Sequence, residues 1–349
     1  MVKRNIFAAL ALVSVLLLAS IPALAQDQAV ELGPITQRIL DRGELVCGVN
    51  TSLPGFATLN DAGVYEGFDV EFCRAVAAAI LGNADAVSFR PLQAGERQAA
   101  LQSGEIDMMS RNTTWTLSRD SVWGATFGPT TFYDGQGLMV RSDSGITEIE
   151  QLDGASICVQ SGTTTELNLA DAMSSRGIEY TPQVFADAPA TWEAYLTGRC
   201  DSFTTDKSGL VAYQGAAEDP GAHFIMEITL SKEPLGPLSS QSDPQFADIV
   251  RWVVFGMIQA EEFGINSENV DEFLTSESPD IQRFLGIGEN AAGSYFGIAN
   301  DFMVTVIRQV GNYGEAFDRH LGPDTVFNLD RGLNALWTDG GLLYSPPFR

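Results

Sequence analysis

Apolar and polar residues follow two different periods in the first third of the chain, and the two periods alternate. Residues 43–49 (GELVCGV) and 86–92 (AVSFRPL) are short apolar runs that predict buried strands, whereas 65–82 (YEGFDVEFCRAVAAAILG) has the spacing of an amphipathic helix. A helix at 95–104 and a strand at 105–110 continue the series. This succession of β-α-β units predicts a mostly parallel sheet covered by helices.

The same corner occurs twice along the chain, which bears on the number of lobes. The segments LQSGEIDMMSRNTT and YLTGRCDSFTTDKS both pass from a helix through a small residue and a glycine to an aspartate, Asp107 or Asp201, and then to a strand. The repetition indicates two similarly built lobes, although glycine ends so many helices that two unrelated corners are the alternative. A length of 349 residues also favours two folded units.

The N-terminus has the layout of a secretory signal peptide. It combines two positive charges, a short apolar run and the ending Ala-Leu-Ala, so we predict a signal peptide at residues 1–25 and a mature chain from about Gln26. A membrane anchor is the alternative, but the apolar run is short and the cleavage pattern follows it directly. No cysteine follows the cut, and no later stretch approaches the roughly 20 apolar residues of a membrane span. We expect a soluble, exported protein.

The charge of the chain argues against two classes of partner. Its formal net charge is −25, which repels nucleic acid and anionic lipid surfaces. Lysines occur only at Lys3, Lys207 and Lys232, so arginine supplies almost all of the positive charge. Arginine is suited to bidentate recognition of carboxylates, although genomic bias and a salty habitat would also explain the shortage of lysine.

Four cysteines in an exported chain predict disulfides. Four cysteines allow three connectivities. We favour Cys47 with Cys73 and Cys158 with Cys200, because each pair then closes a local loop within one half of the molecule. Zinc is the alternative, but no pair has the spacing of metal ligands and the only histidines are His223 and His320. We therefore expect no metal.

Polar clusters follow the predicted strands, at the end where open α/β sheets bind their ligands. They comprise Asn50–Phe56 after the first strand, Arg97 after the second, Ser110–Arg119 after the third, QSGTTTE after the strand ASICV, and Asp206. If two lobes meet edge to edge, all five clusters face one crevice. The positions of these groups therefore predict a ligand site between the lobes.

The chemistry of these clusters is complementary to an α-amino acid. Arg119 can hold a carboxylate through two parallel hydrogen bonds, to which a hydroxyl such as Thr114 can add. Thr163 and Glu166 fit the capping-box pattern and so predict a helix N-terminus that also favours an anion. Asp206 supplies an acceptor for an ammonium group. The alternatives are that Thr163 is only a helix cap and that Asp206 is only the N-cap of the next helix.

Several of these motifs resemble a known family. They are GVYEGFDVEFCRAVAAAI, LQSGEIDMMSRNTTWTLSRD, GTTTE, TTDKSGLVAY and the ending QVGNYGEAFDRHLGPDTVFNLDRGLNALWTDGGLLYSPPFR. The chain is similar to the periplasmic solute-binding proteins of polar amino-acid ABC transporters (extracellular family 3), and most of all to the general L-amino-acid branch. The resemblance implies that Arg119 holds the ligand α-carboxylate, that Asp206 holds the α-ammonium and that Thr114 and Thr164 add hydrogen bonds. Arg97 stands where binders of acidic amino acids carry an arginine for the side-chain carboxylate.

The chain departs from the family pattern at two positions. Phe56 matches only loosely the aromatic residue that covers the ligand, because SLPGF carries an extra residue, and Asn112 stands where serine is common. Both are kept as candidate ligand-binding residues, whereas Arg111 is interpreted as a structural or rim residue.

The resemblance also implies the architecture. It predicts a type II periplasmic binding protein with two α/β lobes of parallel sheet, joined by two crossovers near TTFYDGQGLMV and ITLSKEPLGPL, and a C-terminal helical extension that braces lobe 1. The predicted boundaries are 31–134 and 231–262 for lobe 1, 139–228 for lobe 2 and 263–349 for the extension.

The implied function is capture of L-amino acids between the lobes, closure of the lobes and delivery to an ABC permease in the inner membrane. We expect a periplasmic monomer without cofactor. The alternative is a periplasmic dehydratase of cyclohexadienyl amino acids on the same fold, but both histidines lie outside the polar clusters and no nucleophile elbow occurs. A receptor sensor domain would need an attached membrane helix. The preferred amino acid stays open.

Overall fold

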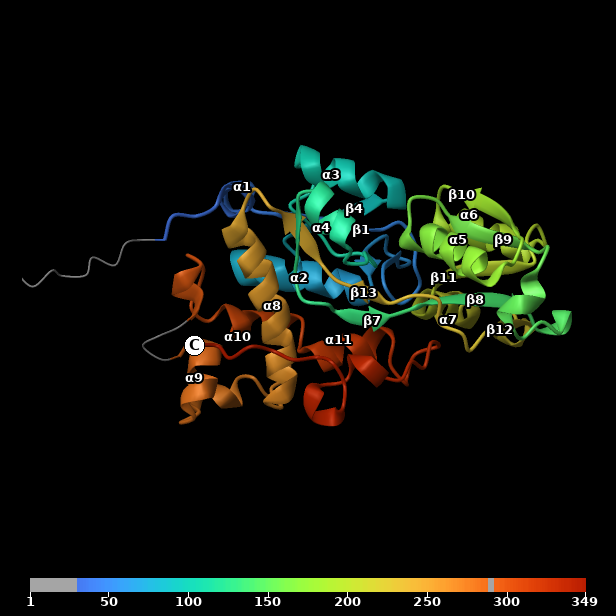
Figure 1. Cartoon of the computed structure of the whole chain (residues 1–349). Helices are drawn as coiled ribbons and strands as arrows, with labels where there is room; N and C mark the ends of the chain where they lie inside the picture. The colour runs from blue at the N-terminus through green and yellow to red at the C-terminus, as the bar shows by residue number, and fades with distance from the viewer. Residues whose placement is uncertain (1–29, 288–291) are drawn as a thin grey trace, which may run out of the picture.

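Two α/β lobes lie side by side and are joined by a ribbon of two strands (Figure 1). The structure is a computed structural model that describes residues 30–287 and 292–349. The predicted signal peptide therefore lies outside the described residues.

Lobe 1 is built on a five-stranded sheet with the order β4-β1-β5-β14-β6. The strands are β1 (Leu45–Asn50), β4 (Val87–Leu92), β5 (Met108–Met109), β6 (Ala125–Phe127) and β14 (Leu238–Ser240). β1 is parallel to both β4 and β5, and β14 is antiparallel to β5 and β6. Between β1 and the first long helix, the chain forms a short hairpin of β2 (Thr58–Leu59) and β3 (Tyr65–Glu66).

Lobe 2 repeats the plan with the strand order β10-β9-β11-β8-β12. Its strands are β8 (Gln136–Arg141), β9 (Ser156–Gln160), β10 (Thr181–Phe185), β11 (Ser202–Asp206) and β12 (His223–Ile225). β9 is parallel to β10 and β11, whereas β8 is antiparallel to β11 and β12.

The two-lobed α/β fold predicted from the sequence is confirmed, but its sheets are mixed rather than mostly parallel. Only the strands that follow β-α-β units run parallel. β8 is the first strand of lobe 2, and β14 is the strand by which the chain returns to lobe 1. Each is reached directly from the other lobe and not through a helix packed on its own sheet, so each runs antiparallel to its neighbours.

Helices cover both sheets and build the rest of lobe 1. Those of lobe 1 and its return are α1 (Pro34–Arg42), α2 (Phe68–Leu81), α3 (Arg97–Ser103), α4 (Leu117–Val122) and α8 (Pro244–Glu262); those of lobe 2 are α5 (Thr164–Arg176), α6 (Ala188–Leu196) and α7 (Lys207–Gly215). α8 shows how local sequence sets a boundary. The Asp243 side chain accepts from the Phe246 amide at 2.9 Å, and proline occupies the first helical position.

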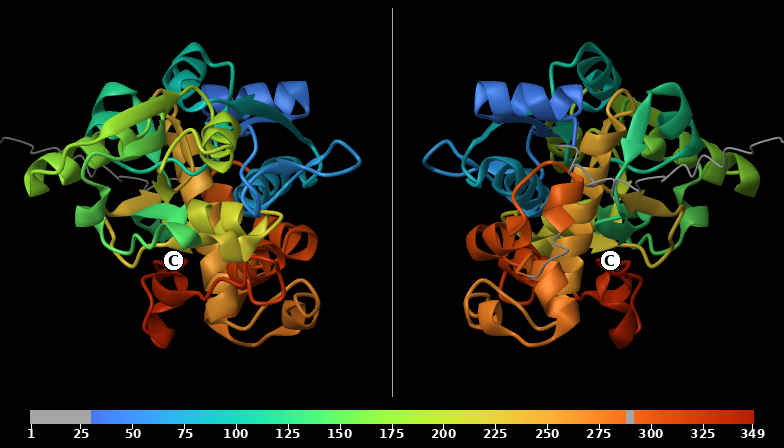
Figure 2. Two further views of the ribbon diagram at one scale, coloured as in Figure 1. Left: turned by 90° about the vertical axis from the view of Figure 1, so that its right-hand side faces the viewer. Right: turned by 90° about the vertical axis from the view of Figure 1, so that its left-hand side faces the viewer.

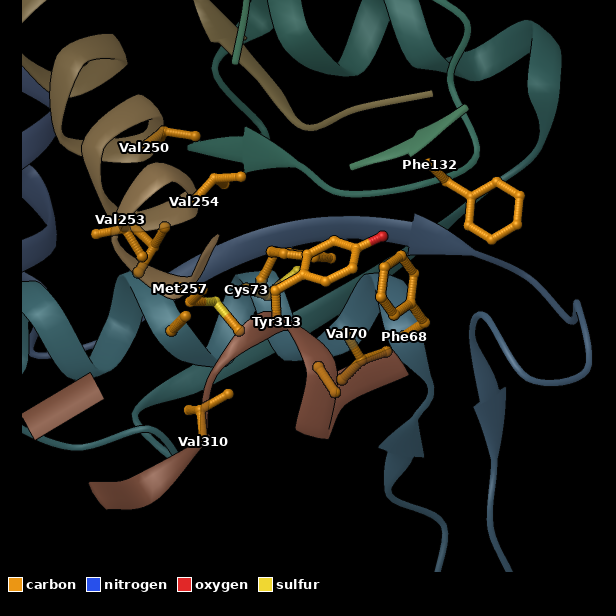
Figure 3. Packing of buried hydrophobic residues seen from close by; sticks show 14 of the residues in the cluster. Phe68, Val70, Cys73, Phe132, Val250, Val253, Val254, Met257, Val310 and Tyr313 are labelled. Atoms are coloured by element: carbon orange, nitrogen blue, oxygen red, sulfur yellow. The ribbon is translucent and has the colours of Figure 1, made fainter. Parts of the chain in front are cut away.

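The C-terminal extension, residues 263–349, contains α9 (Pro279–Leu285), α10 (Phe302–Gln309) and α11 (Tyr313–His320). It forms the side of lobe 1 opposite α1 and α3 (Figure 1, Figure 2). Figure 3 shows the shared core, in which residues of α2, β7, α8 and α11 pack together with Val310, the residue that follows α10. Phe68 makes edge contacts with Tyr313 and Phe317, at centroid distances of 5.6 and 6.1 Å. The extension is thus part of the core of lobe 1.

The crossover ribbon consists of β7 (Phe132–Asp134) and β13 (Glu233–Leu235), which pair antiparallel with Glu233 opposite Asp134. The extension holds its outer edge. The Tyr133 amide donates to Asn334 Oδ1 at 2.6 Å, and Asn334 Nδ2 donates to the Tyr133 carbonyl at 3.3 Å. Tyr313 Oη donates to the Thr131 carbonyl at 2.7 Å just before the ribbon. The ribbon is therefore bound to the extension on the side away from β13.

The two disulfides are confirmed as predicted. Cys47 on β1 is bonded to Cys73 on α2, and Cys158 on β9 is bonded to Cys200 next to β11, with Cα–Cα distances of 6.0 and 5.6 Å. Each disulfide lies within one lobe, so neither restrains the lobes relative to each other.

Candidate functional site

A narrow polar cavity lies between the lobes, and eleven residues line it. Lobe 1 contributes Arg97, Arg111, Asn112, Thr114 and Arg119, and lobe 2 contributes Gln160, Thr163, Thr164, Thr165, Thr205 and Asp206. Its free space is about 20 Å³, which corresponds to only one or two water molecules. The lobes are therefore closed on each other, and a ligand must enter while they are apart.

Seven of the eight ligand-binding residues predicted from the sequence line this cavity, namely Arg97, Asn112, Thr114, Arg119, Thr163, Thr164 and Asp206. The topology explains why they converge. The segments after β4 and β5 leave the carboxyl ends of parallel strands in lobe 1, and those after β9 and β11 do so in lobe 2. The cavity lies where the two sets of strand ends face each other.

Three arginines form the positively charged wall of the cavity. Arg97, Arg111 and Arg119 are all buried, with exposed fractions of 1%, 3% and 6%. Their hydrogen bonds within the described part of the chain go to neutral acceptors. Arg111 donates to the Leu92 carbonyl and Arg119 to the Thr114 carbonyl. Arg97 donates to two backbone carbonyls and one threonine hydroxyl, those of Ala94, Gly162 and Thr113. None of the three forms an ion pair with a carboxylate of the described residues.

Burial of these arginines has an electrostatic cost, which the nearby carboxylates Asp69, Asp206 and Glu233 offset only in part, since the pKa of all three arginines is still lowered. Burial is the main cause that lowers the pKa of all three guanidinium groups, and it lowers that of Arg111 to about 10. Repulsion between the arginines lowers the pKa of Arg97 and Arg111 further. The guanidinium groups of Arg97 and Arg119 also lie over the ring of Trp123, at 5.5 and 5.2 Å. An anion in this cavity would offset the cost of burying the charges.

Asp206 supplies the opposite charge from lobe 2. It ends β11, is 6% exposed and makes no capping hydrogen bond to α7, so the alternative of a simple N-cap is not realised. Asn112 Nδ2 donates to its Oδ2 at 3.0 Å across the lobe interface. Burial, followed by repulsion from Asp134 and Glu233, raises the pKa of Asp206 well above its usual range. A cation beside Asp206 would stabilise its ionised form.

The N-terminus of α5 forms another part of the cavity wall. Thr163 Oγ1 accepts from the Glu166 amide at 3.1 Å and donates to the Gln160 carbonyl at 2.7 Å, so Thr163 does cap the helix. It also lines the cavity, as Thr164 and Thr165 of the first turn do. Thr163 is therefore a helix cap that also lines the cavity, and its role in ligand binding stays a prediction.

Direct hydrogen bonds join the lobes around the cavity. Besides the bond from Asn112 to Asp206, Arg97 donates to the Gly162 carbonyl at 3.0 Å, and the hydroxyls of Thr114 and Thr164 lie 3.2 Å apart. Each of these three contacts, the first two of which are hydrogen bonds, pairs a residue of lobe 1 with one of lobe 2, so they belong to the closed arrangement.

Phe56 is the predicted residue that the structure does not bring to the cavity. It is fully buried in lobe 1, where its ring contacts Phe68 at 6.2 Å and Phe132 at 5.5 Å. The turn before it explains the difference, because the Phe56 amide donates to the Leu53 carbonyl at 3.0 Å and Gly55 has φ +75°, a conformation that side chains disfavour, so the chain leaves this turn with Phe56 in the core. Phe56 is a core residue and no cover for a ligand.

Arg111 and Glu233 lie at or near the cavity but are not among the predicted ligand-binding residues. Arg111, interpreted as structural or at the rim, lines the cavity. Its place in the same polar stretch as Arg119 was the available signal. Glu233 on β13 lies behind the cavity wall and accepts hydrogen bonds from both Thr114 and Thr164. No local motif marks it, because its position depends on the return of the chain from lobe 2.

The two histidines lie away from the cavity. His223 Nδ1 is 3.1 Å from Tyr195 Oη, and His320 Nε2 is 2.8 Å from the buried Glu71. Over residues 30–287 and 292–349, no group of three or more histidine, cysteine or acidic side chains could hold a metal ion. In the same residues, no helix has the length and apolar character needed to cross a membrane.

Comparison with known proteins gives consistent matches over most of the chain. Residues 45–340 match the family described as bacterial extracellular solute-binding proteins, family 3. The chain is 50% identical to the general L-amino acid-binding periplasmic protein AapJ of Rhizobium johnstonii, over 88% of this chain and 91% of that protein. It is 46% identical, over the same shares, to the glutamate/glutamine/aspartate/asparagine-binding protein BztA of Rhodobacter capsulatus. These names describe binding proteins and give no support to the dehydratase alternative.

A solved structure is similar over nearly its whole length. The periplasmic binding protein of an ABC transporter from Brucella ovis, with glutathione bound, superimposes with a TM-score of 0.88 at 48% identity. The match covers 90% of this chain and 99% of the Brucella protein, which therefore has the same two-lobed fold.

Proposed function

Because the chain belongs to the bacterial extracellular solute-binding proteins of family 3, we propose that it captures L-amino acids in the cavity between its lobes and presents them to an ABC permease. The observation that carries the proposal is the pair of buried, opposite charges on opposite lobes. Arg119 comes from lobe 1 and Asp206 from lobe 2, and both line one cavity. A zwitterion that contacts both can hold the lobes together, and it binds the closed form better than the open one.

Each end of the zwitterion has its own group in this proposal. Arg119 binds the α-carboxylate, with the free amides at the N-terminus of α5 on the facing lobe. Asp206 binds the α-ammonium. The positive charge of that group stabilises the ionised Asp206 carboxylate, whose pKa is raised when no cation is beside it. Asn112 fixes the Asp206 carboxylate from lobe 1.

We further propose that a second carboxylate on the ligand increases its affinity. Arg97 and Arg111 add two buried charges to that of Arg119, and none of the three forms an ion pair with a carboxylate in the described part of the chain. Acidic amino acids offer such a carboxylate, and BztA is named for binding glutamate and aspartate together with their amides, glutamine and asparagine. Glutathione, bound in the Brucella structure, also has an α-amino acid end and a second carboxylate. It is therefore a useful probe.

The compartment and assembly are part of the same proposal. AapJ is named a periplasmic protein, so we propose export to the periplasm with cleavage of residues 1–25. We propose that the protein acts as a monomer in complex with a permease in the inner membrane. The boundaries of the lobes predicted from the sequence stay a prediction.

Calorimetric titration of ligand-stripped protein tests the proposal. The ligands are glutamate, glutamine, leucine and glutathione, and the variants are Arg119→Ala, Asp206→Asn and Arg97→Ala. Loss of a buried partner of a charge typically costs about 2 to 5 kcal/mol, so the first two variants should lose about thirty-fold or more in affinity for every amino acid. Arg97→Ala should weaken glutamate more than leucine. Unchanged binding in Arg119→Ala would refute the assignment.

A further inference from the structure

Glu233 lies at the junction of both lobes and the crossover ribbon, and it is only 1% exposed. Its carboxylate accepts four hydrogen bonds. Oε2 accepts from Thr114 of lobe 1 at 2.5 Å and from Thr164 of lobe 2 at 2.9 Å. Oε1 accepts from Asn168 of lobe 2 at 2.7 Å and from Ser231 of the returning crossover at 2.5 Å. Glu233 does not itself line the cavity, but both threonines do.

The number of protons in this cluster determines which way the hydroxyls point. A hydroxyl has one proton to donate and two lone pairs that can accept, and a carboxylate can only accept. Thr114 and Thr164 therefore both direct their single proton to Glu233 Oε2. Their oxygens lie only 3.2 Å apart, yet no proton is left for a bond between them. Two oxygens that can only accept thus face the cavity, one from each lobe.

An ammonium group fits this arrangement, because it has three protons to donate and accepts none. The carboxylate of Asp206, which lines the same cavity, is the third acceptor. The negative charge of Glu233 also favours a cation at this end of the cavity, and it acts on Arg119 and Asp206 as a near neighbour.

We propose that Glu233 is a positioning residue that makes Thr114 and Thr164 acceptors for the ligand ammonium, so that the site selects amino acids over the same acids without an amine. The inference rests on the proposed function and deepens it. It differs from the sequence-based expectation that Thr114 adds to the carboxylate grip of Arg119. Because the Thr114 hydroxyl donates its proton to Glu233 Oε2, it has none left for a ligand carboxylate.

The substitution Glu233→Gln reverses the polarity of the cluster with little change in shape. Asn168 Nδ2 is a donor, so the position of Oε1 must keep an acceptor. The glutamine carbonyl therefore takes that position, and its NH₂ group takes the position of Oε2. That NH₂ group donates to both threonines, whose protons then turn toward the cavity and oppose an ammonium group.

The experiment measures the affinity of L-glutamate and of glutarate, which is glutamate without its amine, for wild type and for Glu233→Gln. L-leucine and 4-methylpentanoate form a second pair, whose shared side chain is uncharged. In wild type the amino acid should bind more tightly than its deaminated counterpart. In Glu233→Gln this preference should fall by about tenfold or more, since hydrogen bonds to a charged group are lost, with glutarate affinity held or increased.

Ser231→Ala is the matched control. It removes another short hydrogen bond to Glu233, at Oε1, but leaves Oε2 and both threonine protons as they are. It should keep the wild-type preference for the amine. If Glu233→Gln weakens glutamate and glutarate equally, its role is structural and the inference is overturned, as it is if the preference stays unchanged.

A second variant tests the inference should Glu233→Gln fail to fold in circular dichroism. Thr114→Val removes one acceptor, so it should weaken glutamate by about tenfold and spare glutarate. Equal weakening of both would mean that Thr114 serves the carboxylate, against the inference. If wild type binds none of the amino acids, the proposed function fails and the inference fails with it. If wild type binds them and the variants keep its preference, only the inference fails.

Discussion

Gly215, the last residue of α7, offers a way to perturb the closed form of the protein without touching its ligand site. It faces the extension loop at residues 322–330, which belongs to the other lobe. A Cβ atom at Gly215 would lie 3.0 Å from the Val326 carbonyl oxygen and 3.3 Å from Phe327 Cδ1. Both distances are shorter than ordinary contacts, so Gly215→Ala forces α7 and the loop apart by a few tenths of an ångström when the lobes close.

The size of the effect follows from where the strain occurs. Overpacking by one methyl group typically costs about 1 to 3 kcal/mol, and here the cost falls on the closed form alone. Ligand affinity depends on the free energy of closure, so the dissociation constant should rise by about 5- to 150-fold. Alanine also favours a helix over glycine by up to about 1 kcal/mol, so the free energy of unfolding without ligand should hold or increase.

Two measurements on Gly215→Ala separate these effects. Calorimetry gives the affinity for glutamate, and stopped-flow fluorescence gives the rate of ligand release, which should account for most of the loss. Gly95→Ala is the control, because Gly95 also lies at the lobe interface, next to Gly162, but a Cβ atom there meets nothing within 4 Å. An affinity of Gly215→Ala equal to that of Gly95→Ala, with unfolding unchanged in both, would refute the reasoning.

Three further predictions concern stability. Burial raises the pKa of Asp69 to about 7, so the stability that protonated Asp69 provides is fully present below about pH 4 and is lost as the pH rises through 7. In urea unfolding, the free energy of unfolding of Asp69→Asn should therefore fall less between pH 4.5 and 8 than that of wild type, and an equal fall in both would contradict this. Replacing both Cys158 and Cys200 by serine should lower the free energy of unfolding by about 4 kcal/mol for a 42-residue separation, with ligand affinity kept because the bridge lies within one lobe; an affinity loss would argue against free movement of the lobes. Asn334→Ala should cost about 1 to 3 kcal/mol, since it leaves the amide and carbonyl of Tyr133 unpaired, and a melting temperature equal to that of wild type would show that water replaces the asparagine.

The positions of the strands and of the charged site residues could be predicted because they depend on local sequence. Arg119 and Asp206 each follow a strand of a β-α-β unit, and the ends of such strands share one edge of a sheet. The disulfides could be predicted for a related reason, since each bridge closes a short loop within one lobe. In both cases a short stretch of chain contains the information.

The features that could not be predicted depend on segments distant in sequence. Glu233 meets Thr114 only because the chain returns from lobe 2 beside its outgoing strand, 119 positions after the threonine. The same return makes β14 antiparallel, against the expectation of a parallel sheet. Phe56 was misplaced because an aromatic side chain suits a ligand cover and a core position equally well, and its contacts with Phe68 and Phe132 come from later segments of the chain.

The hydrogen bonds between Asn334 and Tyr133 have a consequence for the behaviour of the protein in concentrated solution. A two-stranded ribbon has open edges, and an open edge is a template on which a strand of another molecule can add. The Asn334 side chain occupies both backbone groups of Tyr133 on the outer edge of β7, as a neighbouring strand would. A side chain, unlike a strand, offers no further edge to extend. The ribbon that joins the lobes is thereby protected from intermolecular β-pairing and the aggregation that follows from it.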